Sequence, residues 1–424
     1  MRITENSIVS DFLANLTKSR ERINRLNIQL ATQKKLQKVS DDPVLANTLL
    51  RLDADLSRLD SYKSNIVAGQ STLKMTTDSL GNVSDILQSV KGLLAGSTDA
   101  DPSSLTNLSV QMDQFVNMSV DIANTQFDRK YIFGGTGTTA PPFVSSGAPQ
   151  TVTYQGNADA VRFQVGDGIS SVVNVSGAAA FNSTGAIDFA GLLDRAAPVN
   201  TTVTTTVGMT DGNGVAHGVL MTMQKTGANS WALSAAMPPG ATDASLAGGT
   251  ATVTFDPATG SLASVVRGAP LVLTPAATPP AQAAPPLTLM IRGTGLSEGT
   301  PAGGGASTLT GTHTPISVFN QLIALRDTLR SGGQPSADDI AMVGVMQDVV
   351  MREQARAGSL SGNLTTSDEY LTAQKEHLLD LRSAKQDVDL TEIGMKLKQE
   401  EVMLDATLSA AAKIIPKSLL DFLT

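Results

Sequence analysis

Histidine is the side chain best suited to proton transfer or metal binding at neutral pH, and this sequence contains three, His217, His313 and His377. They lie far apart in the chain, and none occurs in a His-Glu-x-x-His spacing or beside a cluster of carboxylates. The sequence has no cysteine, which excludes disulfides and thiolate metal sites. We therefore expect neither a metal site nor a histidine base.

Two other stretches could bind a small ligand, but each has a simpler interpretation. Gly134-Gly135-Thr136-Gly137 is rich in glycine but lacks the Gly-Lys-Ser/Thr that follows in a phosphate-binding loop, so it predicts a corner between a helix and a strand. Ser40, Asp41, Asp42 and Pro43 favour the start of a helix, with Asp42 as its cap and Pro43 as its first residue. The sequence thus predicts a protein that is not an enzyme, without catalytic residues or cofactors.

The composition limits the class of partner. The chain has 424 residues, a net charge of −8 and a pI near 5.0, with 4% aromatic and 17% charged residues. No cluster of basic and aromatic residues suggests a nucleic-acid surface, and the short basic patch Lys34, Lys35, Lys38 reads as a solvated helix face. The N-terminal stretch lacks the apolar core of a signal peptide, and no stretch is apolar enough to span a membrane. We expect that any export uses a route without a cleaved signal.

Apolar residues recur every seven positions through a long stretch without proline, between Pro43 and Pro102. The row runs Leu45, Leu52, Leu59, Ile66, Leu73, Leu80, Leu87, Leu94. Such a row lies along one side of a helix, here on the order of 75 Å long. A companion row begins with Leu49 and Leu56 and then turns polar. This helix needs a second helix against it.

A second stretch, from about Ala337 to Arg382, has the same period and carries Leu364, Leu371 and Leu378. The seam of the two helices is predicted to contain Leu52, Leu59, Ile66, Leu73, Leu80, Leu87, Leu364, Leu371 and Leu378. Between the two helices the sequence has short, β-branched segments separated by Gly and Pro. The predicted fold is therefore α+β, an elongated antiparallel helical coiled-coil rod from both termini with an inserted β-rich domain of one or two lobes.

The changes in composition predict five segments. They are an N-terminal assembly helix at 1–42, the first half of the rod at 43–140, the β-rich outer insert at 141–312, the second half of the rod at 313–386, and a C-terminal assembly helix at 387–424. The insert divides into possible lobes at 141–195 and 199–312. We expect one helix from about Glu5 to Val39 and another that ends near Lys130.

The two terminal helices carry more apolar surface than one partner can cover. The predicted packing residues are Ile8, Phe12, Leu16, Ile23, Leu26, Leu30, Val388, Leu390, Met395, Leu397, Val402, Leu404, Leu408 and Ile415. In the last helix these residues form two rows on roughly opposite sides. A helix that is apolar on opposite sides is buried between two partners. The N-terminal helix can cover one row, and the other row has no evident partner within the chain.

The termini together resemble the flagellin family of bacterial flagellar proteins, and within it the members that join hook and filament. The resemblance rests on Met1-Arg2-Ile3-Thr4, Ser40-Asp41-Asp42-Pro43, Tyr131-Ile132-Phe133-Gly134-Gly135-Thr136 with Pro141-Pro142-Phe143, and Ser418-Leu419-Leu420-Asp421-Phe422-Leu423. It covers about 1–143 and 315–424. In the insert, Thr254-Phe255-Asp256 with Gly260-Ser261-Leu262 resembles a β-module of hook-type flagellar proteins.

The resemblance implies a structural protein that joins the hook to the filament and templates the addition of flagellin. It implies that the two ends form the inner tube of an axial ring of subunits and are disordered in the monomer. The implied partners are further copies of this chain, a neighbouring hook-associated protein, flagellin, and a flagellar export chaperone at the C-terminal region. The implied location is the extracellular flagellum, reached through type III export. Two alternatives remain open, a minor filament flagellin and a secreted coiled-coil adhesin with a β-rich binding head.

Overall fold

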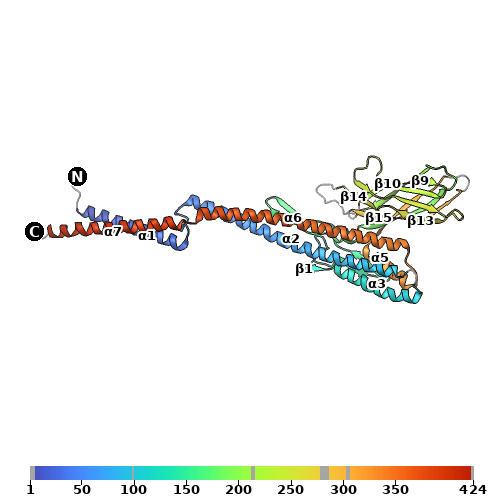
Figure 1. Cartoon of the computed structure of the whole chain (residues 1–424), viewed down its shortest axis with the longest axis horizontal. Coiled ribbons are helices and arrows are strands. Elements are labelled where there is room, and N and C mark those ends of the chain that lie inside the picture. The colour runs from blue at the N-terminus through green and yellow to red at the C-terminus, as the bar shows by residue number, and fades with distance from the viewer. Residues whose placement is uncertain (1–4, 98–99, 212–214, 277–285, 302–305, 422–424) are drawn as a thin grey trace. The chain divides into compact units, whose positions relative to one another are not determined.

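The computed structural model describes residues 5–97, 100–211, 215–276, 286–301 and 306–421, with side chains described between residues 10 and 410 except at 294. The chain divides into two compact units. One combines Met1–Ser64 with Ser367–Thr424, and the other is Asn65–Thr366. Helices and sheets occupy separate parts of the sequence, so the fold is α+β (Figure 1).

The helices are α1 (Glu5–Thr32), α2 (Pro43–Ala95), α3 (Pro102–Ala123), α4 (Gly177–Phe181), α5 (Val318–Arg330), α6 (Ala337–Gln386) and α7 (Leu390–Asp421). α2 has 53 residues and is about 80 Å long. The first helix ends at Thr32 and not near Val39, because the next residue, Gln33, has a positive φ of 58° and its carbonyl accepts a hydrogen bond from Val388.

The predicted end of the third helix near Lys130 is also wrong. α3 stops at Ala123, and the chain turns through Asp128 and Arg129, both with positive φ, between β1 (Gln126–Phe127) and β2 (Lys130–Tyr131). Gly135, in the glycine-rich stretch, follows β2 in a turn and has a φ of +68°. Asp128 and Arg129, both in the left-handed region, form the tight turn of the β1–β2 hairpin. Helical periodicity alone does not reveal such a turn.

In each unit, α2 and α6 run antiparallel and are joined by polar contacts at the companion row of α2. In the first unit, Lys63 pairs with Asp368 at 3.2 Å. In the second, the Gln70 side chain lies 3.1 Å from Thr365 Oγ1, and Gln354 donates to the Thr77 carbonyl at 3.2 Å. The polar residues of this row therefore contact the facing helix.

Two five-stranded sheets form a sandwich in the second unit. One sheet has the order β13-β12-β10-β9-β8, all antiparallel, and the other has the order β11-β14-β15-β7-β16. Their bounds are β7 Thr184–Asp194, β8 Thr202–Thr210, β9 Ala216–Gly227, β10 Ser230–Ala236, β11 Ala244–Ala247, β12 Ala251–Phe255, β13 Leu262–Arg267, β14 Leu271–Pro275, β15 Leu287–Gly299 and β16 Thr310–Ile316. The inward positions of both sheets form one apolar core around Phe189, Trp231 and Phe255.

The sandwich begins earlier than the predicted lobe boundary at 195–199. β7 pairs in parallel with β15 and antiparallel with β16, so Thr184–Asp194 belongs to the second lobe. The preceding region holds two hairpins and the short helix α4. The hairpins are β3 (Phe143–Ser146) with β4 (Thr151–Tyr154) and β5 (Arg162–Gly166) with β6 (Ile169–Val172). The pairing of strands about a hundred residues apart decides the boundary, and the local composition does not reveal it.

An aromatic cluster joins these hairpins to the helices. Phe143 contacts Tyr154, Phe181 and Phe319, with ring centroids 4.9–5.5 Å apart. An ion pair between Arg267 and Asp338 joins the sandwich to α6. A small cavity of about 160 Å³ lies beside this contact. That cavity is lined in part by residues of β15 and α6.

Candidate assembly surface

The two terminal helices lie side by side in the first unit (Figure 1). Arg22 of α1 forms an ion pair with Glu400 of α7 at 2.8 Å, and Ser19 Oγ lies 3.3 Å from the same carboxylate. At the other end of the pair, the Lys35 backbone N–H donates to the Gln386 carbonyl. As the residue number increases along α1, the number of the facing residue decreases, so α1 and α7 are antiparallel.

One side of α7 faces α1 and the other faces solvent. Ile393 is buried, and Leu397 and Leu404, which follow it at helical spacing, are half-buried. Met395 and Val402 are 64% and 58% exposed. At about 100° per residue these two lie on the side of α7 opposite Leu404. We call Met395 and Val402 the outer row of α7.

The remaining predicted packing residues are partly covered at most. Phe12, Leu16, Ile23, Leu26 and Val388 are half-buried, and Leu30, Leu390 and Leu408 are exposed. The side chains of Ile8 and Ile415 lie outside the described residues. Among the described side chains of α1 and α7, only Ser19 and Ile393 are buried. This pair of helices therefore has little core of its own.

The seam residues of α2 and α6 are more deeply buried than the packing residues of the terminal helices. Leu59, Ile66, Leu73, Leu80, Leu87, Leu364 and Leu371 are buried, whereas Leu52 and Leu378 are half-buried. The fully covered ones lie in Asn65–Thr366, where the hairpins and the helices α3 and α5 add further cover. The seam thus becomes more exposed toward the terminal helices.

Caps fix where the long helices begin. The Asp42 carboxylate accepts hydrogen bonds from the N–H groups of Val44 and Leu45 at 3.0 and 2.9 Å. Asp41 accepts from the Lys38 N–H, and Ser40 and Pro43 are exposed beside it. These bonds satisfy backbone donors that a helix start leaves unpaired.

Sequence reasoning missed the cap of α7. The Asp389 carboxylate accepts hydrogen bonds from Glu392 and Thr391, and these bonds lower its pKa. The spacing of Asp389 and Glu392, three residues apart before an apolar helix, is a recognisable start signal. No sequence pattern predicts the ion pair of Arg22 with Glu400, because these residues lie far apart in the chain.

The titratable residues that chemistry would need are dispersed. Nδ1 of His217 lies 2.7 Å from Asp243, and Nε2 lies 3.1 Å from Asp211. Because the two carboxylates lie on opposite sides of the ring, they do not converge on one point. Burial lowers the pKa of His313. Among the described residues no group of His, Asp and Glu is arranged to hold a metal ion.

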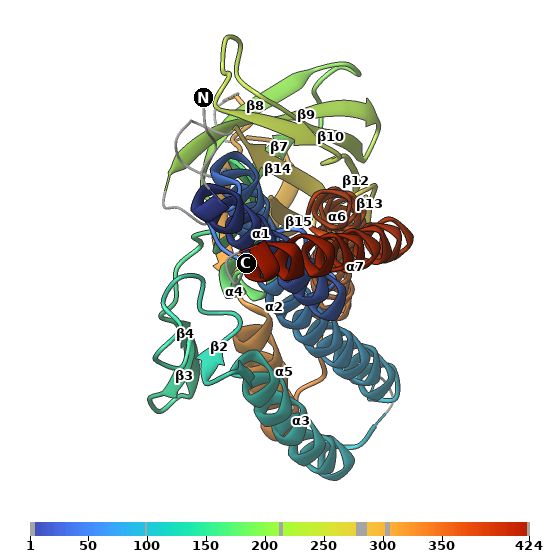
Figure 2. The ribbon, with the colours of Figure 1, turned by 90° about the vertical axis from the view of Figure 1, so that its left-hand side faces the viewer.

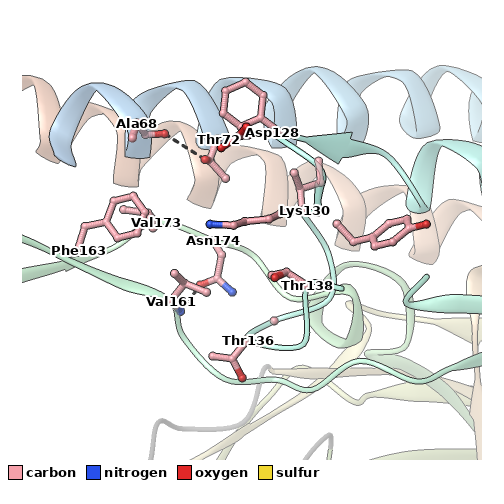
Figure 3. Close-up of a pocket in the computed structure, with 14 residues that line it drawn as sticks. Ala68, Thr72, Asp128, Lys130, Thr136, Thr138, Val161, Phe163, Val173 and Asn174 are labelled. Carbon is pink, nitrogen blue, oxygen red and sulfur yellow. Dashed lines mark hydrogen bonds between the residues drawn. The ribbon is translucent and has the colours of Figure 1, made fainter. Parts of the chain in front are cut away.

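A cavity with a volume of about 370 Å³ lies beside α2. Figure 3 shows Lys130 extending across it between Thr72 and Asn174, with Phe163 and Val173 at one end. Its lining is mainly apolar, although Asp128, Lys130 and Tyr131 also border it. The outer row of α7, in contrast, is an apolar surface exposed to solvent.

The comparisons with known proteins assign the helical N-terminal part. Residues 3–138 match the family described as the bacterial flagellin N-terminal helical region. This part of the chain is similar to the flagellins. The flagellin-type region thus includes α1, α2 and α3 together with the hairpin of β1 and β2.

Residues 180–321 match a second family, the flagellar basal body protein FlaE D2 domain. The match spans the whole sandwich, β7 included, and so agrees with the boundary that strand pairing gives.

Among curated proteins, the chain is homologous to flagellar hook-associated protein 3 of Salmonella typhimurium. The two are 28% identical over 189 residues, which is 43% of this chain. The match spans 57% of the length of that relative.

Solved structures of similar proteins include flagellar hook-associated protein 3 of Legionella pneumophila and FlgL of Xanthomonas campestris. The first has 13% identity and a TM-score of 0.46, and covers 78% of this chain and 96% of that one. The second has 17% identity and a TM-score of 0.37, with 81% and 99% covered.

No helix in the described part of the chain is both long enough and apolar enough to cross a membrane.

Proposed function

We propose that this protein is a structural component of the bacterial flagellum that joins the hook to the filament and templates the addition of flagellin. The observation that carries the proposal is the outer row of α7, which is exposed although the opposite side of the same helix packs on α1. The flagellin-type region and the homology to flagellar hook-associated protein 3 support the assignment to the flagellum.

The outer row gives the proposal its mechanism. Burying the exposed area of Met395 and Val402 against a neighbour would contribute about 1 to 2 kcal/mol for each side chain. Because every subunit carries the outer row of α7, these contributions add up in an axial assembly. Contacts between unlike faces close into rings or continue as helices, so top and bottom can bind different partners. We propose the neighbouring hook-associated protein on one side and flagellin on the other.

Two further elements belong to the same proposal. α2 and α6 would form an antiparallel coiled-coil rod that supports the terminal helices. The terminal helices, with little core of their own, would be ordered only on assembly, and an export chaperone would cover the C-terminal region before then. We propose type III export and an extracellular location at the junction.

Deletion of the gene tests the junction role. We expect cells with hooks but without filaments, which release flagellin into the medium because nothing retains it. A minor flagellin, which the match of residues 3–138 also allows, predicts shortened or absent filaments but no release of flagellin from cells with intact hooks. Normal filaments and no flagellin in the medium would therefore contradict the junction role.

Substitution of the outer row tests the surface itself. Val402→Asp places a charge where a neighbour would bury an apolar side chain, and we expect it to abolish filament formation in a complementation assay. Val402→Leu keeps the position apolar and should restore filaments as the wild type does. Leu404→Asp should also prevent assembly, because Leu404 lies on the side that packs on α1. Wild-type filaments with Val402→Asp would show that the outer row is not an interface.

A further inference from the structure

The cavity of about 370 Å³ beside α2 lies within the second unit and is enclosed by three parts of the chain. α2 contributes Ala68 and Thr72, and the β1–β2 hairpin with the glycine-rich stretch forms a second wall. The β5–β6 hairpin and its flanks contribute Val161, Phe163 and Val173. The volume is in the range of small-molecule pockets. At about 30 Å³ for a group of the size of a water molecule, it holds about twelve non-hydrogen atoms.

Hydrogen bonds within the protein hold the walls of this cavity. The buried side chain of Asn174 accepts a hydrogen bond from the Val161 N–H at 2.8 Å and donates one to the Asp159 carbonyl at 3.1 Å. The Thr72 hydroxyl donates to the Ala68 carbonyl at 3.0 Å, as Figure 3 shows. These polar groups are therefore satisfied by the protein itself, and they fix the shape of the cavity.

The glycine-rich stretch closes the cavity in a defined conformation. Asn157 Oδ1 accepts from the Thr136 N–H at 2.9 Å, and Asn157 Nδ2 donates to Thr136 Oγ1 at 2.8 Å. A Cβ at Gly135 would overlap the Asn157 side chain, so only glycine permits this approach. Figure 2 shows β2 next to β3 and β4, and the hydroxyl of Tyr154 in β4 donates to the Phe133 carbonyl, just after β2, at 2.9 Å. The cavity is thus preformed.

Asp128 and Lys130 differ from these satisfied groups. Both border the cavity and both are exposed, so a small molecule can reach them from solvent. Among the described side chains, no ion pair or side-chain hydrogen bond joins them to each other or to another group. In Figure 3, Lys130 extends across the cavity and Asp128 lies beside Thr72. The apolar cavity therefore presents one positive and one negative charge that the protein leaves unpaired.

These two charges narrow the ligand. A carboxylate can pair with Lys130 and an ammonium with Asp128, and apolar walls strengthen both interactions because they reduce screening by water. An apolar acid without an ammonium brings a second negative charge to Asp128, and an apolar amine brings a second positive charge to Lys130. Like charges brought together disfavour both of these ligands. A molecule that carries both groups avoids both repulsions.

We propose that this cavity binds a small zwitterion with an apolar side chain, the class of the apolar α-amino acids. Lys130 binds the carboxylate, Asp128 binds the ammonium, and the ligand's side chain lies among Val161, Phe163 and Val173. L-phenylalanine is close to the size that the cavity holds. The site is separate from the outer row of α7 and does not depend on the proposed function.

Isothermal titration of the full chain with three related probes tests the class of ligand. L-phenylalanine carries both charges, 3-phenylpropanoate lacks the ammonium, and 2-phenylethylamine lacks the carboxylate. We expect L-phenylalanine to bind about tenfold or more tightly than either of the others, because each of them lacks one charge-assisted bond. Equal binding of 3-phenylpropanoate or 2-phenylethylamine would overturn the zwitterion. No binding of L-phenylalanine up to its solubility limit would overturn the site.

Charge removal tests the two residues one at a time. Asp128→Asn keeps a residue type that tolerates the positive φ of this turn, and Lys130→Met keeps an apolar stem. We expect each to weaken the binding of L-phenylalanine about tenfold or more, whereas Asp128→Asn should not weaken the binding of 3-phenylpropanoate. The matched controls Asp121→Asn and Lys74→Met replace exposed residues outside the lining and should bind as the wild type does. Wild-type binding of L-phenylalanine by Asp128→Asn or Lys130→Met would overturn the proposal.

Filling the cavity gives an independent readout. Ala68→Phe places a ring at the α2 wall and should abolish the binding of L-phenylalanine while both charges remain. Ala54→Phe, at an exposed position of the same helix outside the lining, is the control. Circular dichroism in urea verifies that each variant is folded. Wild-type binding by Ala68→Phe would assign the ligand to another place and overturn the proposal.

Discussion

At the scale of single residues, His217 shows how a buried polar group is accommodated. The ring is 3% exposed and lies between Asp211, which is also buried, and Asp243, which is half exposed. Burial by itself would lower the pKa of His217, but the hydrogen bonds to Asp211 and Asp243 outweigh burial and raise it. The ring therefore links β9 to the segment before β11 most strongly when it is protonated.

This linkage predicts a pH dependence with a definite sign. A raised pKa in the folded state stabilises the protein fully below the unfolded value, about 6.5 for histidine, and that stabilisation disappears as pH rises through the folded pKa. We expect the difference in unfolding free energy between wild type and His217→Gln to shrink as pH rises above about 6.5. Urea unfolding followed by Trp231 fluorescence measures it. A difference that grows with pH would contradict the prediction.

Asp243 does not disturb this measurement. The hydrogen bond from His217 lowers its pKa below the ordinary value of 3.8. The contribution of Asp243 to stability is therefore present at higher pH and is lost only as pH falls through that lowered value.

Gly177 is the second residue with a precise requirement. A Cβ at this position would lie 2.7 Å from both Phe143 Cζ and Tyr154 Cε2. Burial raises the pKa of Tyr154 to about 12, and its hydroxyl lies 2.9 Å from the Phe133 carbonyl, so this ring is held in place. We expect Gly177→Ala to lower the unfolding free energy by about 1 to 3 kcal/mol.

The control for Gly177→Ala is another glycine. Nothing lies within 4 Å of a Cβ at Gly358 in α6. Gly358→Ala should therefore stabilise the protein by up to about 1 kcal/mol through helix propensity. Urea denaturation followed by circular dichroism compares the two, and equal effects would show that the aromatic cluster tolerates a methyl group.

At the scale of elements, a buried charged cluster joins the two sheets of the sandwich. Glu298 of β15 is fully buried and accepts a hydrogen bond from Trp231 of β10 at 3.0 Å. Lys225 of β9, 3% exposed, lies 3.5 Å from the same carboxylate, and Arg195 lies 3.8 Å from it. Lys225 Nζ also hydrogen-bonds to the carbonyl of Asp194 at 3.2 Å. The two sheets therefore share a charge pair that only their packing brings together.

Substituting Lys225 alone should lower the unfolding free energy more than substituting Lys225 and Glu298 together. Lys225→Met leaves the buried Glu298 carboxylate with only the partly exposed Arg195, 3.8 Å away, among its two ion-pair partners, and we expect the unfolding free energy to fall by about 3 to 5 kcal/mol. The double variant Lys225→Met with Glu298→Gln removes the buried charge and should recover part of that loss. Trp231 fluorescence in urea reports both variants. Equal instability of the single and double variants would show that the carboxylate is stabilised by other groups.

At the scale of the whole molecule, the two units differ in how much core they hold. Asn65–Thr366 contains the sandwich core and the aromatic cluster, whereas α1 and α7 bury Ser19 and Ile393 among their described side chains. A helix pair with so little core opens readily. We predict that limited proteolysis of the dilute full chain cuts first within about 1–40 and 390–424. Mass spectrometry identifies the products, and ends that survive as long as the middle would contradict the prediction.

Much of the helical part could be predicted from the sequence, because helical periodicity is local. The seven-residue row and Pro43 indicated a long helix, and α2 begins at Pro43. The ends of α1 and α3 could not be predicted, because Gln33, Asp128 and Arg129 adopt positive φ without being glycine. The hydrogen bond from Val388 to Gln33 is a tertiary contact, whereas Asp128 and Arg129 form the local turn between β1 and β2 without the glycine that would signal it.

The candidate assembly surface, like the helices, could be predicted from the sequence only in part. The sequence by itself determined that α7 has two apolar sides, because a helix places side chains at fixed angles. Only the tertiary structure decided that Leu404 faces α1 while Val402 faces solvent, and that β7 pairs with β15 about a hundred residues away. The physical reason is that periodicity specifies which residues share a face, whereas the partner of that face depends on contacts between distant parts of the chain.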